Sequence, residues 1–315
     1  MSIDKEKLKI LLYGGGAVGS YFAGALNLDG HDVSLLTRGA HLDIIKESGL
    51  SMSTHWGKFE SNLRVVESTE ESYDLIILAV KTYSIEEILP NLKKLSNSSN
   101  YVLCIQNGTF TYDFLSKEIP KSNILNGLTY VDAVRSSPGS VDQFGEEAKI
   151  IFGKENVTAE ERKDLSTLKG ILNSEKVQVE FSDNIQKSIW EKLIMVAAIG
   201  SMMSFGNCSA SRIFGDQKLL MMLEDMIKEM NSAAKSINVN LDLHYELDTV
   251  QGLRDRCNEI HASLKEDLDN QRPLELNEIL GEAIRIGNRN KVDMSTCELV
   301  FNKLYPYISG GKKYG

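Results

Sequence analysis

The first half of the chain alternates short, almost purely aliphatic runs with segments of helical periodicity. Four of these runs, KILLYG, DVSLLTR, DLIILAV and YVLCIQN, are each followed by a stretch that reads as a helix. Strands that are apolar along their whole length are typical of a parallel sheet covered on both faces. Alternation of strand and helix at this spacing therefore predicts an α/β fold whose N-terminal part is a doubly wound sheet.

The pattern changes after Asn123. The next segments read as strands with turn signals (TYVDAV, SVDQFG, AKIIFG and, after one more helix, VQVEFS), and beyond Asp183 long helical patterns replace the strands. At 315 residues the chain is long enough for two hydrophobic cores. We expect a sheet domain over residues 1–182 and an all-helical domain over residues 183–315.

The overall charge of the chain excludes some classes of partner. The net charge is −9 at pH 7, so the protein repels nucleic acid and anionic membranes, and an anionic ligand needs a local basic pocket. No signal-peptide pattern is evident, and the uncharged run after Lys192 is interrupted at Gly200, which argues against a membrane span. The four cysteines lack metal-ligand spacing, so we expect no metal site and reduced thiols in a cytoplasmic protein.

The turn after the first aliphatic run carries a G-x-G-x-x-G pattern. In YGGGAVGS its glycines are Gly14, Gly16 and Gly19, and Ala17 and Val18 open the following helix. At this place the first glycine permits a tight turn and the second lets the backbone approach a pyrophosphate. The third lets the helix and the strand pack closely. We expect these five residues to bind a dinucleotide in a Rossmann-type domain.

The end of the second strand selects between the two nicotinamide dinucleotides. In NAD-binding domains this strand ends in an acid that binds the ribose hydroxyls. Here it ends in LLTRG, with Arg38 and no acid before Asp43. Because a guanidinium suits a 2′-phosphate, the sequence favours NADP (NADPH) as the cofactor. The alternative is an ordinary exposed arginine after a strand.

Two polar residues follow later strands of the same predicted sheet. Lys81 comes directly after DLIILAV, and Asn107 ends the YVLCIQN run and precedes Gly108. The carboxyl ends of parallel strands meet at the edge where ligands bind. Asn-Gly is also a common turn pair, so each residue has an ordinary interpretation by itself. Together, on adjacent strand ends, they favour a ligand site.

One lysine precedes a long uncharged stretch of the chain, in SIWEKLIMVAAIGSMMSFGNCSAS. At helical spacing the neighbours of Lys192 are Ile189, Met195, Val196 and Ile199, which are all apolar. An ammonium group on such a face must be paired, extend to water or carry a function. The residue types alone leave these alternatives open.

With these residues assembled, the chain resembles the ketopantoate reductase family (2-dehydropantoate 2-reductase), NADPH-dependent oxidoreductases of pantothenate biosynthesis. The likeness runs nearly end to end: it covers the glycine pattern, Arg38, AVK at Lys81, QNG at Asn107, SSPGSVDQFG, IWEKL at Lys192 and SLKEDLDNQRPLELNEILG from Ser263. The last two segments are the most specific. The resemblance implies a Rossmann domain, a helical domain, an active site in the cleft between them, and a small 2-oxo acid as substrate. We allow for a homodimer.

The resemblance also implies that Lys192 donates a proton to the substrate carbonyl. As hydride adds to a ketone carbon, negative charge grows on the oxygen, and a nearby ammonium group can stabilise that charge and then give up a proton. An apolar setting makes a lysine a better acid.

Four further residues take roles from the resemblance. Glu275 is expected to be catalytic and to lie near the lysine and the cofactor, and Ser263 to contact the substrate carboxylate. Lys81 and Asn107 are expected to bind both cofactor and substrate near the nicotinamide. Alternatively, Ser263 is a solvated helix residue, and Glu275, after Pro273, complements the dipole of a helix in its first turn.

The chain departs from the family where the substrate is recognised. The family's asparagines four and eight residues after the lysine are replaced here by Val196 and Gly200, and the one after NCS by Ala210. Loss of these groups should weaken a hydroxylated substrate. We therefore carry three hypotheses: a ketopantoate reductase, a reductase of an apolar branched 2-oxo acid, and a non-catalytic NADP(H)-binding sensor. The presence of Lys192 and Glu275 argues against the sensor.

Overall fold

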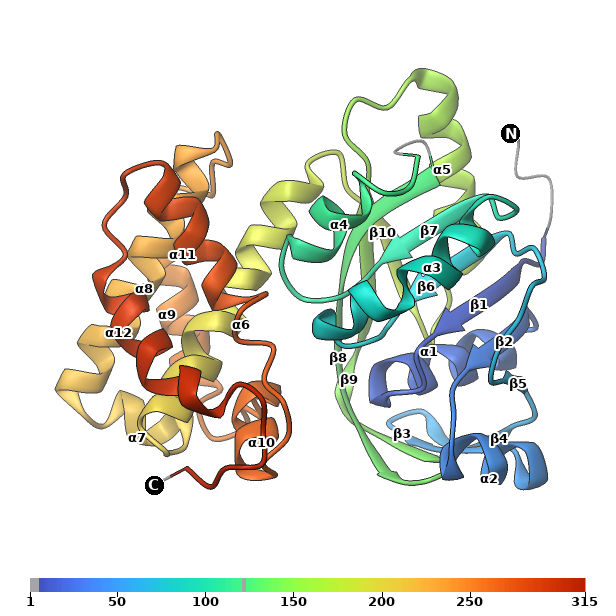
Figure 1. Ribbon diagram of the computed structural model, residues 1–315, viewed down its shortest axis with the longest axis horizontal. Helices are drawn as coiled ribbons and strands as arrows, with labels where there is room; N and C mark the ends of the chain where they lie inside the picture. The colour runs from blue at the N-terminus through green and yellow to red at the C-terminus, as the bar shows by residue number, and fades with distance from the viewer. Residues whose placement is uncertain (1–5, 121–122, 315) are drawn as a thin grey trace. The chain divides into compact units, whose positions relative to one another are not determined.

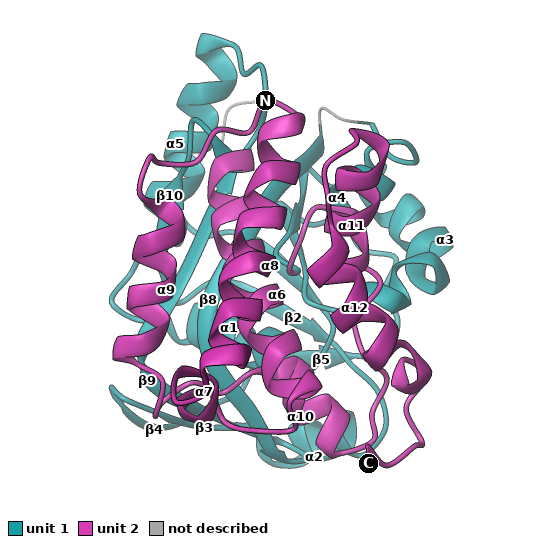
Figure 2. Cartoon of the chain, turned by 90° about the vertical axis from the view of Figure 1, so that its left-hand side faces the viewer, with its two compact units in different colours: residues 1–106, 111–185 teal, residues 107–110, 186–315 magenta. Residues whose placement is uncertain are grey.

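The chain forms two compact units in the computed structural model, which describes residues 6–120 and 123–314. Unit 1 comprises residues 1–106 and 111–185, and unit 2 comprises residues 107–110 and 186–315 (Figure 2). The short segment 107–110 thus packs with the second unit although unit 1 residues flank it on both sides. The domain boundary at residue 183 stays a prediction.

Unit 1 is built on one ten-stranded mixed sheet. Its strands are β1 (Lys9–Tyr13), β2 (Asp32–Leu36), β3 (Leu50–Thr54), β4 (Gly57–Ser61), β5 (Arg64–Val66), β6 (Leu75–Leu78), β7 (Tyr101–Cys104), β8 (Ile124–Ser137), β9 (Ser140–Gly153) and β10 (Gln178–Phe181). Their order is β4-β3-β9-β8-β7-β6-β1-β2-β5, with β10 paired to β9. The strands from β8 to β5 in this order run parallel to one another, whereas β8 and β9 are antiparallel.

The parallel strands are covered on both faces, which explains their aliphatic composition. In β1, Ile10 and Leu12 join the core under α1 (Ala17–Leu28), α2 (Ala40–Ser48) and α5 (Ala159–Leu172). Leu11 and Tyr13 of the same strand join the core under α3 (Ile85–Ser96) and α4 (Phe110–Leu115). Figure 1 shows α3 and α4 along one face of the sheet, with the one-turn helix η1 (Thr82–Ser84) leading into α3. The doubly wound N-terminal sheet is therefore confirmed.

Two regions of the sheet were not anticipated from the sequence. The β3–β4 hairpin and β5 were missed, because these strands are short and β3 gains its second partner only from β9, far along the chain. The segments expected as several strands after Asn123 are two continuous strands of 14 residues, β8 and β9. Register shifts near Val131 and Val134 interrupt their pairing, which divides the apolar pattern into apparent pieces.

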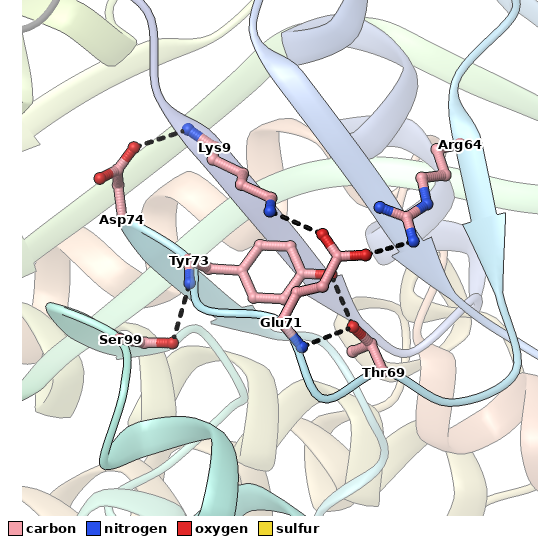
Figure 3. Close-up of polar contacts among 7 residues, drawn as sticks. All are labelled: Lys9, Arg64, Thr69, Glu71, Tyr73, Asp74 and Ser99. Atoms are coloured by element: carbon pink, nitrogen blue, oxygen red, sulfur yellow. Dashed lines mark hydrogen bonds and ion pairs between the residues drawn. The ribbon is translucent and has the colours of Figure 1, made fainter.

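A charged network ties the amino ends of the parallel strands together (Figure 3). The carboxylate of Glu71 accepts a hydrogen bond from Lys9 Nζ, which is 2.6 Å away, and pairs with the guanidinium of Arg64 on its other oxygen. Lys9 opens β1 and Arg64 opens β5, and the backbone N–H of Lys9 donates to Asp74 Oδ2 (2.9 Å), just before β6. These pairings hold the pKa of Glu71 at about 2, with Arg64 the larger cause and Lys9 the next.

Unit 2 contains only helices and loops within the described residues. Beyond β10 the helices are α6 (Ile185–Phe205), α7 (Ala210–Phe214), α8 (Gln217–Ser236), α9 (Tyr245–Asp255), α10 (Ser263–Asp269), α11 (Leu280–Arg289), α12 (Ser295–Leu304) and η3 (Tyr305–Tyr307). The carboxylate of Glu229 in α8 accepts the backbone N–H groups of Thr296 and Cys297, both at 2.9 Å, and so caps the start of α12. The expectation of an all-helical C-terminal part is confirmed.

The central helix of unit 2 is α6. It is long and apolar enough to cross a membrane, but 67% of its most apolar window is buried within the protein. Trp190, Ile194 and Ala198 are fully buried in the core that α6 shares with α8 and α11. This burial is that of a core helix, and it explains why the run after Lys192 lacks charge.

We expect Glu71→Gln to lower stability in a pH-dependent way. Because folding lowers the pKa of Glu71 from 4.5 to about 2, its contribution is present above pH 4.5 and is lost as the pH falls through about 2. The difference in denaturation midpoint between wild type and variant should therefore be largest near pH 7 and vanish toward pH 2.

The matched control is Glu118→Gln, which removes a surface carboxylate whose ion-pair partner within the described part of the chain is Lys93. Its effect on the midpoint should be small. A Glu71→Gln difference that stayed constant from pH 7 to pH 2 would mean that shape, and not charge, accounts for the loss.

Candidate active site

The glycine-rich turn after β1 is packed too closely for side chains. A Cβ on Gly19 would lie 1.9 Å from the carbonyl oxygen of Gly14. Gly14 has φ +120°, and a Cβ there would lie 2.8 Å from the backbone N of Val80, just after β6. Gly16, in contrast, has open space around its missing side chain. Gly14 and Gly19 therefore let strand and helix meet, whereas Gly16 leaves room for a ligand.

The turn also presents the free end of a helix. Gly16 is the N-cap of α1, no side chain among the described residues caps that end, and the first turn carries no acidic residue. The N–H groups of this turn, with the positive end of the helix dipole, suit an anion such as a pyrophosphate. In the sheet, β1 lies between β2 and β6, so the turn sits where the strand order reverses. The residues present therefore fit a dinucleotide.

Arg38 follows β2 at the carboxyl edge of the sheet. Its side chain is 77% exposed, and its Nη2 lies 3.7 Å from Glu87 Oε1, a distant surface pair. Thr37, just before it, packs against Gly15: a Cβ on Gly15 would lie 2.4 Å from the Cβ of Thr37. The glycine turn and the end of β2 thus meet, and the exposed Arg38 follows directly after this contact.

A buried histidine, which was not predicted from the sequence, holds the elements around the glycine turn together. His41 in α2 accepts the backbone N–H of Gly139 on Nδ1 (2.9 Å), so its neutral ring carries the proton on Nε2, which lies 2.9 Å from Ser20 Oγ. Burial, helped by the charge of Arg135, lowers the pKa of His41 to about 4. The histidine therefore joins α1, α2 and the β8–β9 hairpin in its neutral form.

Lys81 and Asn107 fall in different units. Lys81 precedes η1 after β6 and is half-buried in unit 1. Asn107 belongs to unit 2, where the next residue, Gly108, has φ +85° and would bring a Cβ within 3.1 Å of the carbonyl oxygen of Glu278. The turn interpretation of Asn-Gly is thus correct for the backbone, and the same turn presents Asn107 beside the segment that follows α10.

Lys192 lies in the first half of α6 and is 9% exposed. Ile189 and Ile199 on its face are buried, and Met195 and Val196 are half-buried, so the apolar setting expected from the sequence is present. A lysine so placed is not a surface residue that extends freely into water.

The positions that depart from the family's asparagines lie in apolar surroundings. Gly200 is buried, and a Cβ there would contact the Cβ atoms of Leu264 (3.6 Å) and Ala262 (3.7 Å) at the start of α10. Ala210 is buried in the unit 2 core. These contacts bring position 200 next to the segment that carries the predicted substrate residue Ser263.

Ser263 is the first residue of α10 and is exposed. Glu275 is 8% exposed and lies in a loop five residues before α11, so the alternative of a helix-dipole acid was wrong. Burial, and to a smaller extent the charge of Glu275, raises the pKa of Glu278. Oε2 of Glu278 is buried and has no hydrogen-bond partner among the described residues. The carboxyl groups of Glu275 and Glu278 therefore lie near each other in this loop. The sequence did not predict a role for Glu278.

No metal-binding arrangement accompanies these residues in the described ranges: no group of three or more His, Cys, Asp or Glu side chains could hold an ion. The four cysteines are all free thiols, and Cys104 and Cys297 are buried.

Two profiles of one protein family match the chain. "Ketopantoate reductase PanE/ApbA" matches residues 10–156, and "Ketopantoate reductase PanE/ApbA C terminal" matches residues 184–307. Similar proteins include the uncharacterized oxidoreductase YkpB of Bacillus subtilis, 23% identical over 95% of this chain and 99% of its own. Another is the 2-dehydropantoate 2-reductase of Pyrococcus abyssi, 29% identical over 88% of this chain and 90% of its own.

Solved structures share the fold along nearly the whole chain. The ternary structure of D-mandelate dehydrogenase with NADH and anilino(oxo)acetate has a TM-score of 0.86 and 25% identity, and covers 95% of this chain and 97% of its own. A PanE/ApbA family ketopantoate reductase from Ralstonia eutropha has a TM-score of 0.85 and 22% identity, with the same coverage.

Alanine at Gly16 and at Gly19 should have different effects. Gly19→Ala forces the backbone to move and should cost about 1–3 kcal/mol of stability. The Cβ of Gly16→Ala meets no described atom within 4 Å, so the denaturation midpoint should stay near that of wild type. NADPH affinity should fall, because the backbone can no longer approach the pyrophosphate. Denaturant unfolding without cofactor and fluorescence titration with NADPH measure the two effects. Wild-type NADPH affinity in Gly16→Ala would refute the assignment of this turn.

Proposed function

The chain belongs to the ketopantoate reductase family of oxidoreductases, and on that premise we propose that it is a cytoplasmic enzyme that reduces a small 2-oxo acid to the 2-hydroxy acid with NADPH. Ketopantoate, which gives pantoate for pantothenate biosynthesis, is the family's default substrate. The observation that carries the proposal is a buried lysine on an apolar helix face, in a chain whose other unit has an open glycine turn followed by an exposed arginine.

The cofactor half of the proposal rests on unit 1. Gly14, Gly16 and Gly19 with the start of α1 would hold the pyrophosphate, and Arg38 the 2′-phosphate. When bound, NADPH supplies the hydride for the substrate carbonyl carbon. Arg38 is supported by the lack of any carboxylate from Leu36 to Gly39, where an NAD-binding domain has its ribose-binding acid.

The catalytic half rests on unit 2. Lys192, held by α6 among apolar side chains, would stabilise the negative charge that develops on the carbonyl oxygen and then give that oxygen a proton. Glu275, which is buried like Lys192, would offset the free-energy cost of burying the Lys192 ammonium group. Ser263 and Asn107 would orient the substrate, and Lys81 would serve cofactor and substrate.

A second substrate class is supported by one group of positions. Val196 and Gly200 supply no hydrogen-bonding side chain, and position 200 faces the apolar atoms of Ala262 and Leu264. A branched apolar 2-oxo acid would lose nothing there, whereas the hydroxyl of ketopantoate would be desolvated without a partner. The structure of D-mandelate dehydrogenase with NADH and anilino(oxo)acetate, a ligand that carries a phenyl ring, is similar to this chain over nearly its full length.

Lys192→Ala should lower turnover of 2-oxo acids by roughly a hundredfold or more, the usual worth of a positioned general acid. NADPH affinity and the denaturation midpoint should stay close to those of wild type. Lys187→Ala is the matched control, since Lys187 lies on the same helix but pairs with Asp242 through a 2.6 Å contact. Full activity of Lys192→Ala in the NADPH-oxidation assay would remove Lys192 from the mechanism.

A panel of 2-oxo acids tests the substrate. We expect 2-oxoisovalerate to rival ketopantoate in kcat/KM, and asparagine at positions 196 and 200 to shift preference toward ketopantoate by roughly fivefold per restored hydrogen bond, or about 1 kcal/mol. Val196→Leu, which stays apolar, should cause no such shift. Efficient reduction of ketopantoate by the wild type, with no turnover of the apolar acid, would refute the apolar pocket and leave the reductase assignment intact.

A further inference from the structure

One cation at the carboxyl edge of the sheet has no role in the function proposed above. Arg135 lies near the end of β8 and is exposed, and its Nη1 donates to the carbonyl oxygen of Gly15 (3.3 Å). Among the described residues it has no carboxylate partner. It is 120 positions away from the glycine turn in sequence, so nothing in the local sequence indicates this contact.

The tip of the β8–β9 hairpin is fastened to α2, and this fixes where Arg135 emerges. Gly139 donates its N–H to His41 Nδ1 (2.9 Å), and a Cβ on Gly139 would lie 2.3 Å from Ile44 Cγ2. Both contacts are to α2, the helix that begins two residues after Arg38. The hairpin is therefore attached to α2, the helix that follows Arg38, and Arg135 lies four residues before the attached residue Gly139.

The hydrogen bond of Arg135 to Gly15 places the arginine's charge next to the glycine turn. Gly15 packs on Thr37, the residue before Arg38, and lies next to the ring of His41. Arg135 thus contacts the glycine turn directly, and Arg38 follows Thr37 at the end of β2, so two arginines from distant parts of the chain flank the junction of the glycine turn and β2. In a Rossmann domain this junction receives the ribose of the adenosine half, where a 2′-phosphate distinguishes NADP from NAD.

We propose that Arg135 is a second specificity residue, which together with Arg38 binds the 2′-phosphate of NADPH. The inference rests on the proposed use of NADPH. Two guanidinium groups can surround a phosphate with charge-assisted hydrogen bonds that neither supplies alone. The weak surface pair of Arg38 with Glu87 leaves that arginine available for the same ligand.

Dissociation constants for NADPH and NADH, measured by fluorescence titration, test the proposal. Arg135→Ala and Arg135→Gln should each weaken NADPH binding roughly tenfold or more and leave NADH binding within about twofold, as for the loss of a charged hydrogen bond. The glutamine variant is informative because it keeps an N–H donor for Gly15 but has no charge. Arg162→Ala, which removes an exposed arginine of unit 1 paired with Asp183, controls for net charge.

The outcomes separate this inference from the proposed function. Equal losses for both cofactors in Arg135→Ala, with recovery in Arg135→Gln, would show that Arg135 only braces the glycine turn, and would overturn the inference. Selective loss of NADPH affinity in Arg38→Ala without any loss in the Arg135 variants would overturn it as well, while the NADPH assignment stood. A wild type that does not prefer NADPH to NADH would instead overturn the cofactor assignment itself.

Discussion

The close approach of backbone to backbone in the glycine turn is the constraint on which unit 1 depends. The carbonyl oxygen of Gly14 occupies the place of a Gly19 side chain, and Gly14 itself touches the end of β6. Any side chain at either position would push α1 away from the sheet, and α1 contributes fully buried residues such as Tyr21 and Phe22 to the core on that face of the sheet. Among the described residues no side chain caps the start of α1, so the turn that forms the fold also offers backbone N–H groups to an anion.

The distribution of charge in unit 1 follows the direction of the strands. At the amino edge, Lys9 and Arg64 are paired through the single carboxylate of Glu71. At the carboxyl edge, Arg38 pairs distantly with Glu87 at the surface, and Arg135 donates to the backbone carbonyl of Gly15. A chain with a net charge of −9 can attract a multiply charged anion only where cations are left without such neutralisation. The structure has this arrangement at the edge where a parallel sheet binds ligands.

What could be predicted from sequence depended on whether the determinant was local. The strands β1, β6 and β7 could be predicted from their own aliphatic runs, and the glycine turn from the spacing of its glycines. The apolar surroundings of Lys192 could be predicted from its neighbours at helical spacing. The short strands β3, β4 and β5 could not be foreseen, because β3 needs β9 as a partner. His41 and Arg135 were missed for the same reason, since their partners Gly139 and Gly15 are 98 and 120 positions away. The alternative that placed Glu275 in the first turn of a helix was wrong, because this residue precedes α11 instead of opening it, and its catalytic role stays a prediction.

The hydrogen bond that anchors the β8–β9 hairpin restricts the protonation of His41. Nδ1 must keep its lone pair to accept the N–H of Gly139, so a second proton on the ring would break the attachment of the hairpin to α2. Because folding lowers the pKa from 6.5 to about 4, the stability that this bond contributes is complete above pH 6.5 and is lost as the pH falls toward 4. Around neutral pH His41 therefore stays uncharged and holds the hairpin to α2. The positive potential next to the glycine turn comes from arginines, which remain protonated at that pH.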